Sequence, residues 1–171
     1  MADPQQHPAS APVLVGIAPG QDPAVARSAA VLAADLGTAL VVAWADPARY
    51  VVREHRDGSV VSDAVDPDGS EGRHAPDGGA ALDPLRDVLD AAGAAWSFRC
   101  LAGEPARALA QLAATVGART IVVGSREPGL VPRLAEFFAG SVAVQLVHRQ
   151  RVPVLVVPVT AGAHEGRAAW E

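Results

Sequence analysis

The chain has 171 residues and a mass of 17.5 kDa, a size that fits one compact domain with a single core. Half of the residues are hydrophobic, but there are only three Trp, three Phe and one Tyr, so the core must consist of Val, Leu and Ala. All 14 basic residues are Arg, and the lack of Lys excludes Walker-type phosphate loops, pyridoxal Schiff bases and Ser-x-x-Lys acyl-transfer sites.

Charge and cysteine content limit the partners and the compartment. The net charge is −5 and the arginines are scattered, so the sequence has no basic track for a nucleic-acid backbone. The single Cys100 excludes a disulfide framework and fits a reducing cytoplasm. No apolar stretch reaches the roughly 18 residues of a membrane span, and the N-terminus lacks an export signal. We therefore expect a cytoplasmic protein without nucleic-acid or membrane partners.

Short apolar runs alternate with capped helices along the chain. After the first run, Asp22 and Pro23 supply an N-cap and a first helical residue, and Gly37 ends that helix. Pro84 and Pro105 open two further helices in the same way. Strands are predicted at 13–17, 39–44, 95–101, 120–123 and 153–157. Helices are predicted at 22–37, 83–93, 104–117 and 140–148.

The composition also indicates where the domain begins and ends. Residues 1–12 are polar and Pro-rich and are predicted to be a disordered lead, and residues 161–171 a flexible tail. A single domain is expected over 13–160. Within it, residues 47–81 have few apolar anchors and are predicted to form a long mobile loop.

Apolar strands separated by helices predict an α/β fold with a five-stranded, mainly parallel sheet that has helices on both faces. In such sheets ligands bind beyond the carboxyl ends of the strands, where the winding direction reverses. The candidate positions are therefore the residues that follow strands one, two and four: Ala18, Trp44 and Gly124 with their neighbours.

Three spaced segments carry a family resemblance. They are Val122-Val123-Gly124-Ser125-Arg126, Gly140-Ser141-Val142, and Pro153-Val154-Leu155-Val156-Val157. With the Gly103-Glu104-Pro105 start of the third helix, this pattern resembles the universal stress protein (UspA) family, most closely its actinobacterial members. The resemblance covers about residues 13–159. It implies an adenine-nucleotide alpha-hydrolase-like fold with the strand order 3-2-1-4-5.

The family's nucleotide motif, Gly-x2-Gly-x9-Gly-Ser/Thr, is only partly present. Gly124 and Gly140-Ser141 match its two ends, where a glycine lets the backbone approach a ligand and free N–H groups meet an anion. The second glycine is replaced by Glu127, and twelve residues instead of nine separate that position from Gly140. A carboxylate facing a triphosphate is unfavourable. The Asp usual at the end of strand one in nucleotide binders is Ala18 here.

The resemblance therefore implies a nucleotide site that departs from the family motif. Its expected ligand is ATP with Mg²⁺, and Arg126 and Arg133 could offset Glu127. The residues expected to line the site are Ala18, Trp44, Val123, Gly124, Ser125, Arg126, Gly129, Gly140, Ser141 and Val142.

Two other functions stay open at this stage. The chain could be a dimeric interaction or regulatory protein that keeps the fold without the nucleotide site, or a slow ATP hydrolase. No catalytic residue and no metal ligand set is identified, since the sequence shows no positioned general base and no metal-ligand spacing among the histidines. We therefore expect a protein that is not an enzyme.

The remaining candidates have ordinary structural interpretations. Trp44 could stack on a base or be a buried strand residue, Cys100 is a small core residue, and His148 is a surface histidine. The last strand, with Val154, Leu155, Val156 and Val157, is apolar and is expected at a sheet edge, which invites pairing. The resemblance implies a homodimer in which the last strands meet.

Overall fold

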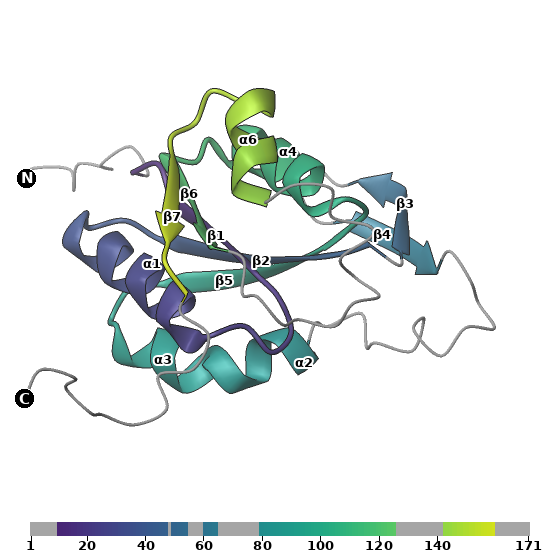
Figure 1. The fold of residues 1–171 in the computed structure, drawn as a ribbon. Coiled ribbons are helices and arrows are strands. Elements are labelled where there is room, and N and C mark those ends of the chain that lie inside the picture. The colour runs from purple at the N-terminus through teal and green to yellow at the C-terminus, as the bar shows by residue number, and fades with distance from the viewer. Residues whose placement is uncertain (1–9, 48, 55–59, 65–78, 126–141, 160–171) are drawn as a thin grey trace, which may run out of the picture.

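A five-stranded parallel sheet forms the centre of the computed structural model, which describes residues 10–47, 49–54, 60–64, 79–125 and 142–159 (Figure 1). The strands of this sheet are β1 (Val13–Ile17), β2 (Leu40–Asp46), β5 (Trp96–Ala102), β6 (Thr120–Gly124) and β7 (Val154–Val157). Their spatial order is β5-β2-β1-β6-β7, and each neighbouring pair is parallel. The predicted strand order 3-2-1-4-5 is confirmed.

Helices cover both faces of the sheet. One face carries α1 (Pro23–Asp35) and a helical segment composed of α2 (Gly79–Leu82), the 3-10 turn η2 (Asp83–Leu85) and α3 (Arg86–Ala91). The opposite face carries α4 (Pro105–Val116) and α6 (Val142–Arg149), which lie side by side (Figure 1). No helix among the described residues is long and apolar enough to span a membrane.

The helix starts follow the predicted capping signals. Asp22 Oδ1 accepts a hydrogen bond from the Ala24 backbone N–H at 2.8 Å, and Pro23 is the first residue of α1. Glu104 caps α4 in the same way ahead of Pro105. At the other end of α4, Gly117 has a φ of +63°, a left-handed conformation that favours glycine. These helix caps and the glycine determine where the helices that connect the strands begin and end.

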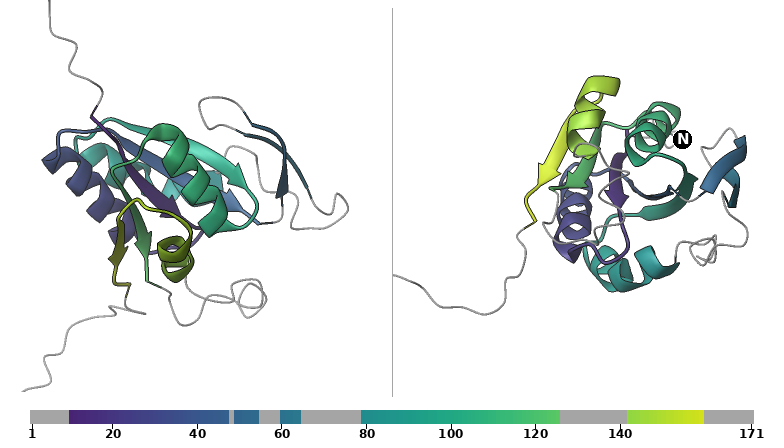
Figure 2. Two further views of the ribbon diagram at one scale, coloured as in Figure 1. Left: turned by 90° about the horizontal axis from the view of Figure 1, so that it is seen from above. Right: turned by 45° about the vertical axis from the view of Figure 1, so that its right-hand side comes forward.

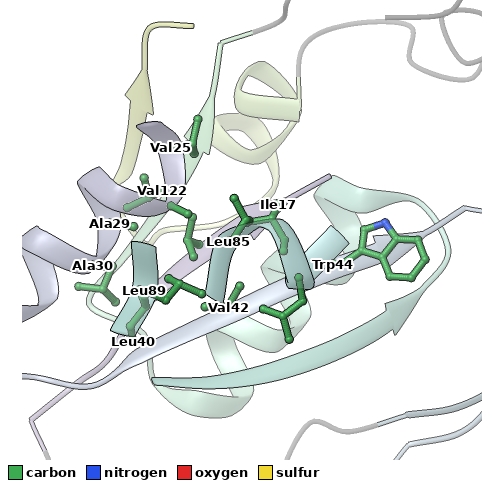
Figure 3. Close-up of a cluster of buried hydrophobic side chains, with 14 of the residues drawn as sticks. Ile17, Val25, Ala29, Ala30, Leu40, Val42, Trp44, Leu85, Leu89 and Val122 are labelled. Carbon is green, nitrogen blue, oxygen red and sulfur yellow. The ribbon is translucent and has the colours of Figure 1, made fainter. Parts of the chain in front are cut away.

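Small residues allow the helices to lie close to the sheet. Alternate strand residues face opposite sides, so Val13, Val15 and Ile17 contact the α1 side and Leu14 the α4 side. Figure 3 shows the first of these two clusters, in which α1 contributes buried Ala29 and Ala30. This Ala- and Val-based packing is the core that the composition predicts.

Residues 47–81 differ from the predicted loop. The structure places an antiparallel hairpin there, with β3 (Arg49–Glu54) and β4 (Val60–Ala64), and α2 begins at Gly79. The valines in both segments favour extended backbone, and pairing the two strands satisfies their backbone hydrogen bonds. The hairpin lies beside β5, at the carboxyl end of β2 (Figure 2). The predicted disordered lead and the flexible tail fall almost entirely outside the described residues.

Candidate functional site

The carboxyl ends of β1 and β6 are adjacent at the position where the sheet changes its winding direction. From β1 the sheet extends through β2 to β5 on one side and through β6 to β7 on the other. Ligands of open α/β sheets bind at such a point because the connections on the two sides leave a crevice between them. The residues that follow β1 and β6 therefore define the candidate site.

A tight turn follows β1. The Gln21 backbone N–H donates to the Ala18 carbonyl at 3.2 Å, and the Ala18 N–H donates back to Gln21 Oε1, also at 3.2 Å. Gly20 has a φ of +73°, which only glycine adopts without strain. Ala18 is exposed at the carboxyl end of β1, as expected. Gln21 was not among the predicted site residues, although it directly precedes the recognisable N-cap of α1.

Gly124 lies at the end of β6, and its α1-facing side has no room for a side chain. A Cβ atom there would be 2.7 Å from Gln21 Nε2, 3.1 Å from Val25 Cγ2 and 3.2 Å from Val159 Cγ2. The sequence interpretation assigned this glycine to backbone approach by a ligand. In the structure the Gln21 carboxamide occupies the space beside this glycine.

Ser125 connects the end of β6 to the last strand. Its backbone N–H donates to the Val157 carbonyl at 2.8 Å, and its Oγ accepts from the Val159 N–H at 2.7 Å. The hydroxyl hydrogen of Ser125 is therefore directed away from Val159. Ser125 is half-buried directly after β6, and its two hydrogen bonds hold the segment after β7 in place.

The other predicted site residues divide into three groups. Trp44 and Val123 are buried, with 6% and 3% exposed, Trp44 in the core on the α1 side of the sheet and Val123 in the core on the α4 side. Trp44 thus matches its interpretation as a buried strand residue (Figure 3). Val142 is half-buried at the start of α6. The predicted residues outside the described part of the chain are Arg126, Gly129, Gly140 and Ser141.

A buried carboxylate ends β2. Asp46 is 6% exposed, and its carbonyl accepts a hydrogen bond from the Gly103 N–H at 2.9 Å, which joins the ends of β2 and β5. Gly103 has a φ of +95°, so this turn requires glycine. Asp46 follows Trp44 by two residues and places an acidic group at the carboxyl edge of the sheet.

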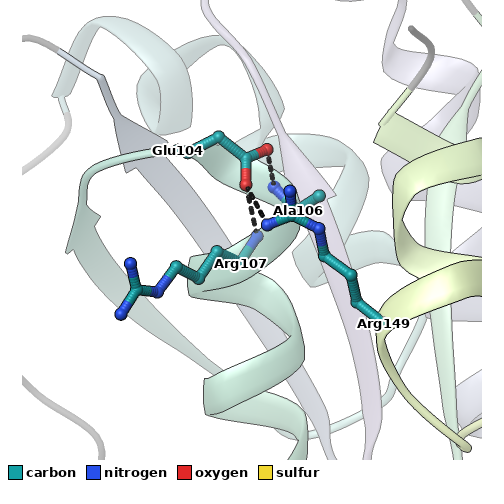
Figure 4. Close-up of polar contacts among 4 residues, drawn as sticks. All are labelled: Glu104, Ala106, Arg107 and Arg149. Carbon is teal, nitrogen blue, oxygen red and sulfur yellow. Dashed lines mark hydrogen bonds and ion pairs between the residues drawn. The ribbon is translucent and has the colours of Figure 1, made fainter.

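Glu104 organises the edge between α4 and α6. Its Oε1 accepts from the Ala106 N–H at 2.9 Å and its Oε2 from the Arg107 N–H at 3.0 Å. The Arg149 guanidinium lies 3.0 Å from the same Oε2, so one carboxylate caps α4 and forms an ion pair with the last residue of α6 (Figure 4). The Glu104 and Arg149 side chains are 34% and 49% exposed, which limits the strength of the ion pair.

We expect Glu104→Ala to lower the free energy of unfolding by about 1–2 kcal/mol, because it removes an N-cap from two backbone N–H groups. Arg149→Ala removes only the exposed ion pair and is expected to cost less than about 1 kcal/mol. Urea unfolding of both variants tests the assignment. Equal losses in the two variants would contradict the view that capping dominates.

An apolar surface surrounds the edge strand. It consists of Val144 and Val147 on α6, 55% and 62% exposed, and Leu155 and Val156 on β7, both 43% exposed; we call these four residues the edge patch. A hollow of about 300 Å³ lies within it, lined by Ala143, Val144, Val147, His148 and Val156. Within the described sheet β7 pairs only with β6, so its other backbone edge is available.

The remaining ligand-type side chains are dispersed. Cys100 is half-buried on β5 and packs against the core, and His148 is exposed on α6, as expected for both. Within the described ranges, no group of three or more His, Cys, Asp or Glu side chains could hold a metal ion.

Comparisons with known proteins agree with this architecture. The sequence model of the universal stress protein family matches residues 11–158. A universal stress protein crystallised in complex with cAMP is 26% identical, with a TM-score of 0.59, and the match covers 88% of this chain and 98% of that chain. No protein with a curated description matches the chain.

Two further solved structures share the fold. The universal stress protein from Archaeoglobus fulgidus in complex with dAMP is 21% identical, with a TM-score of 0.57, over 86% of this chain and 98% of that chain. A family protein from Burkholderia pseudomallei is 23% identical, with a TM-score of 0.54, over 87% and 96%.

Proposed function

Since the chain belongs to the universal stress protein family, we propose that it is a cytoplasmic binding module that takes an adenine nucleotide at the carboxyl ends of β1 and β6. The observation that supports this most directly is the similarity to the universal stress protein in complex with cAMP, which extends over nearly the whole of both chains. The crevice geometry adds support, because Ala18, Gly124 and Ser125 lie at the ends of adjacent strands.

The groups that would bind the phosphate of the nucleotide differ from those of the family's usual motif. With no Lys in the chain, phosphate oxygens would be bound by backbone N–H groups at Gly140 and Ser141 and by Arg126. Glu127 opposes a highly charged triphosphate. We therefore propose that a nucleotide with fewer charges, such as AMP or cAMP, binds at least as well as ATP with Mg²⁺.

We propose binding without turnover. The described groups of the crevice are an exposed alanine, an amide, a serine and a glycine, and hydrolysis needs a base that activates water and a group that stabilises the leaving phosphate. A universal stress module would then act through its nucleotide-bound state and its partners.

A second candidate function rests on the edge patch. The apolar side chains around β7 and its free backbone edge favour a homodimer in which the last strands of two copies meet. We propose this assembly for the nucleotide-bound module. A dimer that has lost nucleotide binding is the alternative function, and the titration below separates the two.

Isothermal titration with AMP, cAMP and ATP with Mg²⁺ tests the proposed function. We expect saturable heat for AMP or cAMP, with no phosphate release on prolonged incubation with ATP. The absence of heat and of a thermal shift with all three nucleotides at millimolar concentration would contradict nucleotide binding and favour the alternative interaction module.

A further inference from the structure

Gln21 is the side chain that joins the ends of β1 and β6. Its Oε1 lies 3.2 Å from the Ala18 backbone nitrogen at the end of β1. Its Nε2 lies on the α1-facing side of Gly124 at the end of β6, 2.7 Å from the position a Cβ atom would take there. Gln21 is half-buried, and its carboxamide lies between the ends of β1 and β6, where the proposed ligand binds.

The hydrogen bond from Ala18 fixes which end of the amide lies beside Gly124. A backbone N–H can pair only with the oxygen of a carboxamide, so Oε1 is held toward β1 and Nε2 is directed toward β6. No described residue accepts a hydrogen bond from Nε2. The group that Gln21 presents is therefore a pair of N–H donors.

Ser125, which follows Gly124, offers a second hydrogen-bond donor at the end of β6. Because Ser125 Oγ already accepts from the Val159 N–H at 2.7 Å, its hydroxyl hydrogen is a further donor next to Gly124. A carboxylate at the end of β1 would accept hydrogen bonds from an amino group of a base. Here Ala18 offers no such acceptor, and the side chain that reaches the crevice from the following turn is a donor.

We propose that Gln21 is a specificity-determining residue whose Nε2 donates a hydrogen bond to an oxygen atom of the bound nucleotide. That oxygen is either an oxygen of the ribose phosphate, which every adenine nucleotide carries, or the 6-oxo group of a purine base, in which case the site prefers a 6-oxopurine to adenine. The proposal rests on the proposed nucleotide binding and specifies what the site recognises. Gly124 contributes by leaving space for the carboxamide, since any side chain there would meet Nε2.

Gln21→Glu tests the proposal because it keeps the shape of the side chain and can still accept from the Ala18 N–H, but replaces the donor by an acceptor. Gln111→Glu is the matched control, since it makes the same change of charge at an exposed position of α4. AMP and IMP share the ribose phosphate and differ at position 6 of the base. Titration of both nucleotides into the three proteins gives the comparison.

We expect Gln21→Glu to weaken binding of IMP about tenfold relative to Gln111→Glu. The variant loses the hydrogen bond from Nε2 and places a carboxylate oxygen, an acceptor, against an oxygen of the nucleotide. If the oxygen belongs to the base, the wild type binds IMP at least as well as AMP and the variant reverses this preference. If it belongs to the ribose phosphate, both nucleotides weaken by similar factors. Equal affinities in Gln21→Glu and Gln111→Glu would overturn the assignment of Gln21.

The side-chain amide resonances of Gln21 provide a readout that does not depend on a variant's folding. They are identified by their absence from the spectrum of Gln21→Glu, and we expect them to shift when the wild-type protein binds nucleotide. Binding without such a shift would overturn the role of Gln21 and leave nucleotide binding intact. A wild type that binds neither AMP nor IMP would overturn both.

Discussion

Leu146→Ala is expected to lower the free energy of unfolding by about 2–5 kcal/mol, because it removes a fully buried side chain and leaves a cavity. Leu146 is 0% exposed and, with Ala143, provides the buried face of the short helix α6. This helix is too short to be stable alone, so its position on the sheet depends on that contact. Chemical denaturation followed by circular dichroism measures the loss.

Leu36→Ala is the matched control for this substitution. It deletes the same atoms from a leucine that is 39% exposed at the end of α1, and we expect a loss below about 1 kcal/mol. A loss in Leu146→Ala no larger than in Leu36→Ala would show that α6 is not anchored through Leu146.

Val156→Asp is expected to convert the proposed dimer into a monomer. Val156 lies on the edge strand within the edge patch, and pairing of two copies through β7 would place the new carboxylate in an apolar interface. An unpaired buried charge costs several kcal/mol, enough to dissociate a dimer at micromolar concentration. Size-exclusion chromatography with light scattering is expected to give twice 17.5 kDa for the wild type and 17.5 kDa for the variant.

Val31→Asp serves as the control, because Val31 is similarly exposed, at 47%, on α1 outside the edge patch. Its mass is expected to equal that of the wild type. A wild type that elutes at 17.5 kDa at micromolar concentration would contradict the dimer, and an unchanged mass in Val156→Asp would exclude β7 as the interface.

Much of the fold could be predicted because local signals and the hydrophobic pattern agree. The Asp22-Pro23 and Glu104-Pro105 pairs mark helix starts, and both side chains cap their helices in the structure. The apolar runs 13–17 and 120–123 read as strands that are buried on both faces, and they form the centre of the sheet. The hairpin was missed because its two strands are short and lie within a long polar stretch, 47–81, whose composition is typical of a loop.

For the candidate site, the sequence indicates where residues lie along the sheet better than what each of them contacts. Ala18 and Ser125 follow directly from the rule that ligands bind at the carboxyl ends of parallel strands. The part played by Gly124 could not be read from the sequence, because it depends on Gln21, Val25 and Val159, which come from distant parts of the chain. Gln21 itself carries no motif, and only the packing of α1 against β6 brings it to the crevice.

Residue-resolved NMR titration with AMP tests directly whether a nucleotide binds at the carboxyl ends of β1 and β6, since it reports both binding and location. We expect the backbone amide shifts to be largest at Ala18, Gln21, Gly124 and Ser125, at the carboxyl ends of β1 and β6. Amides at the opposite edge of the sheet, such as Thr38 and Arg119, are predicted to change little. No shifts at millimolar AMP, or shifts centred on Thr38 and Arg119, would contradict it.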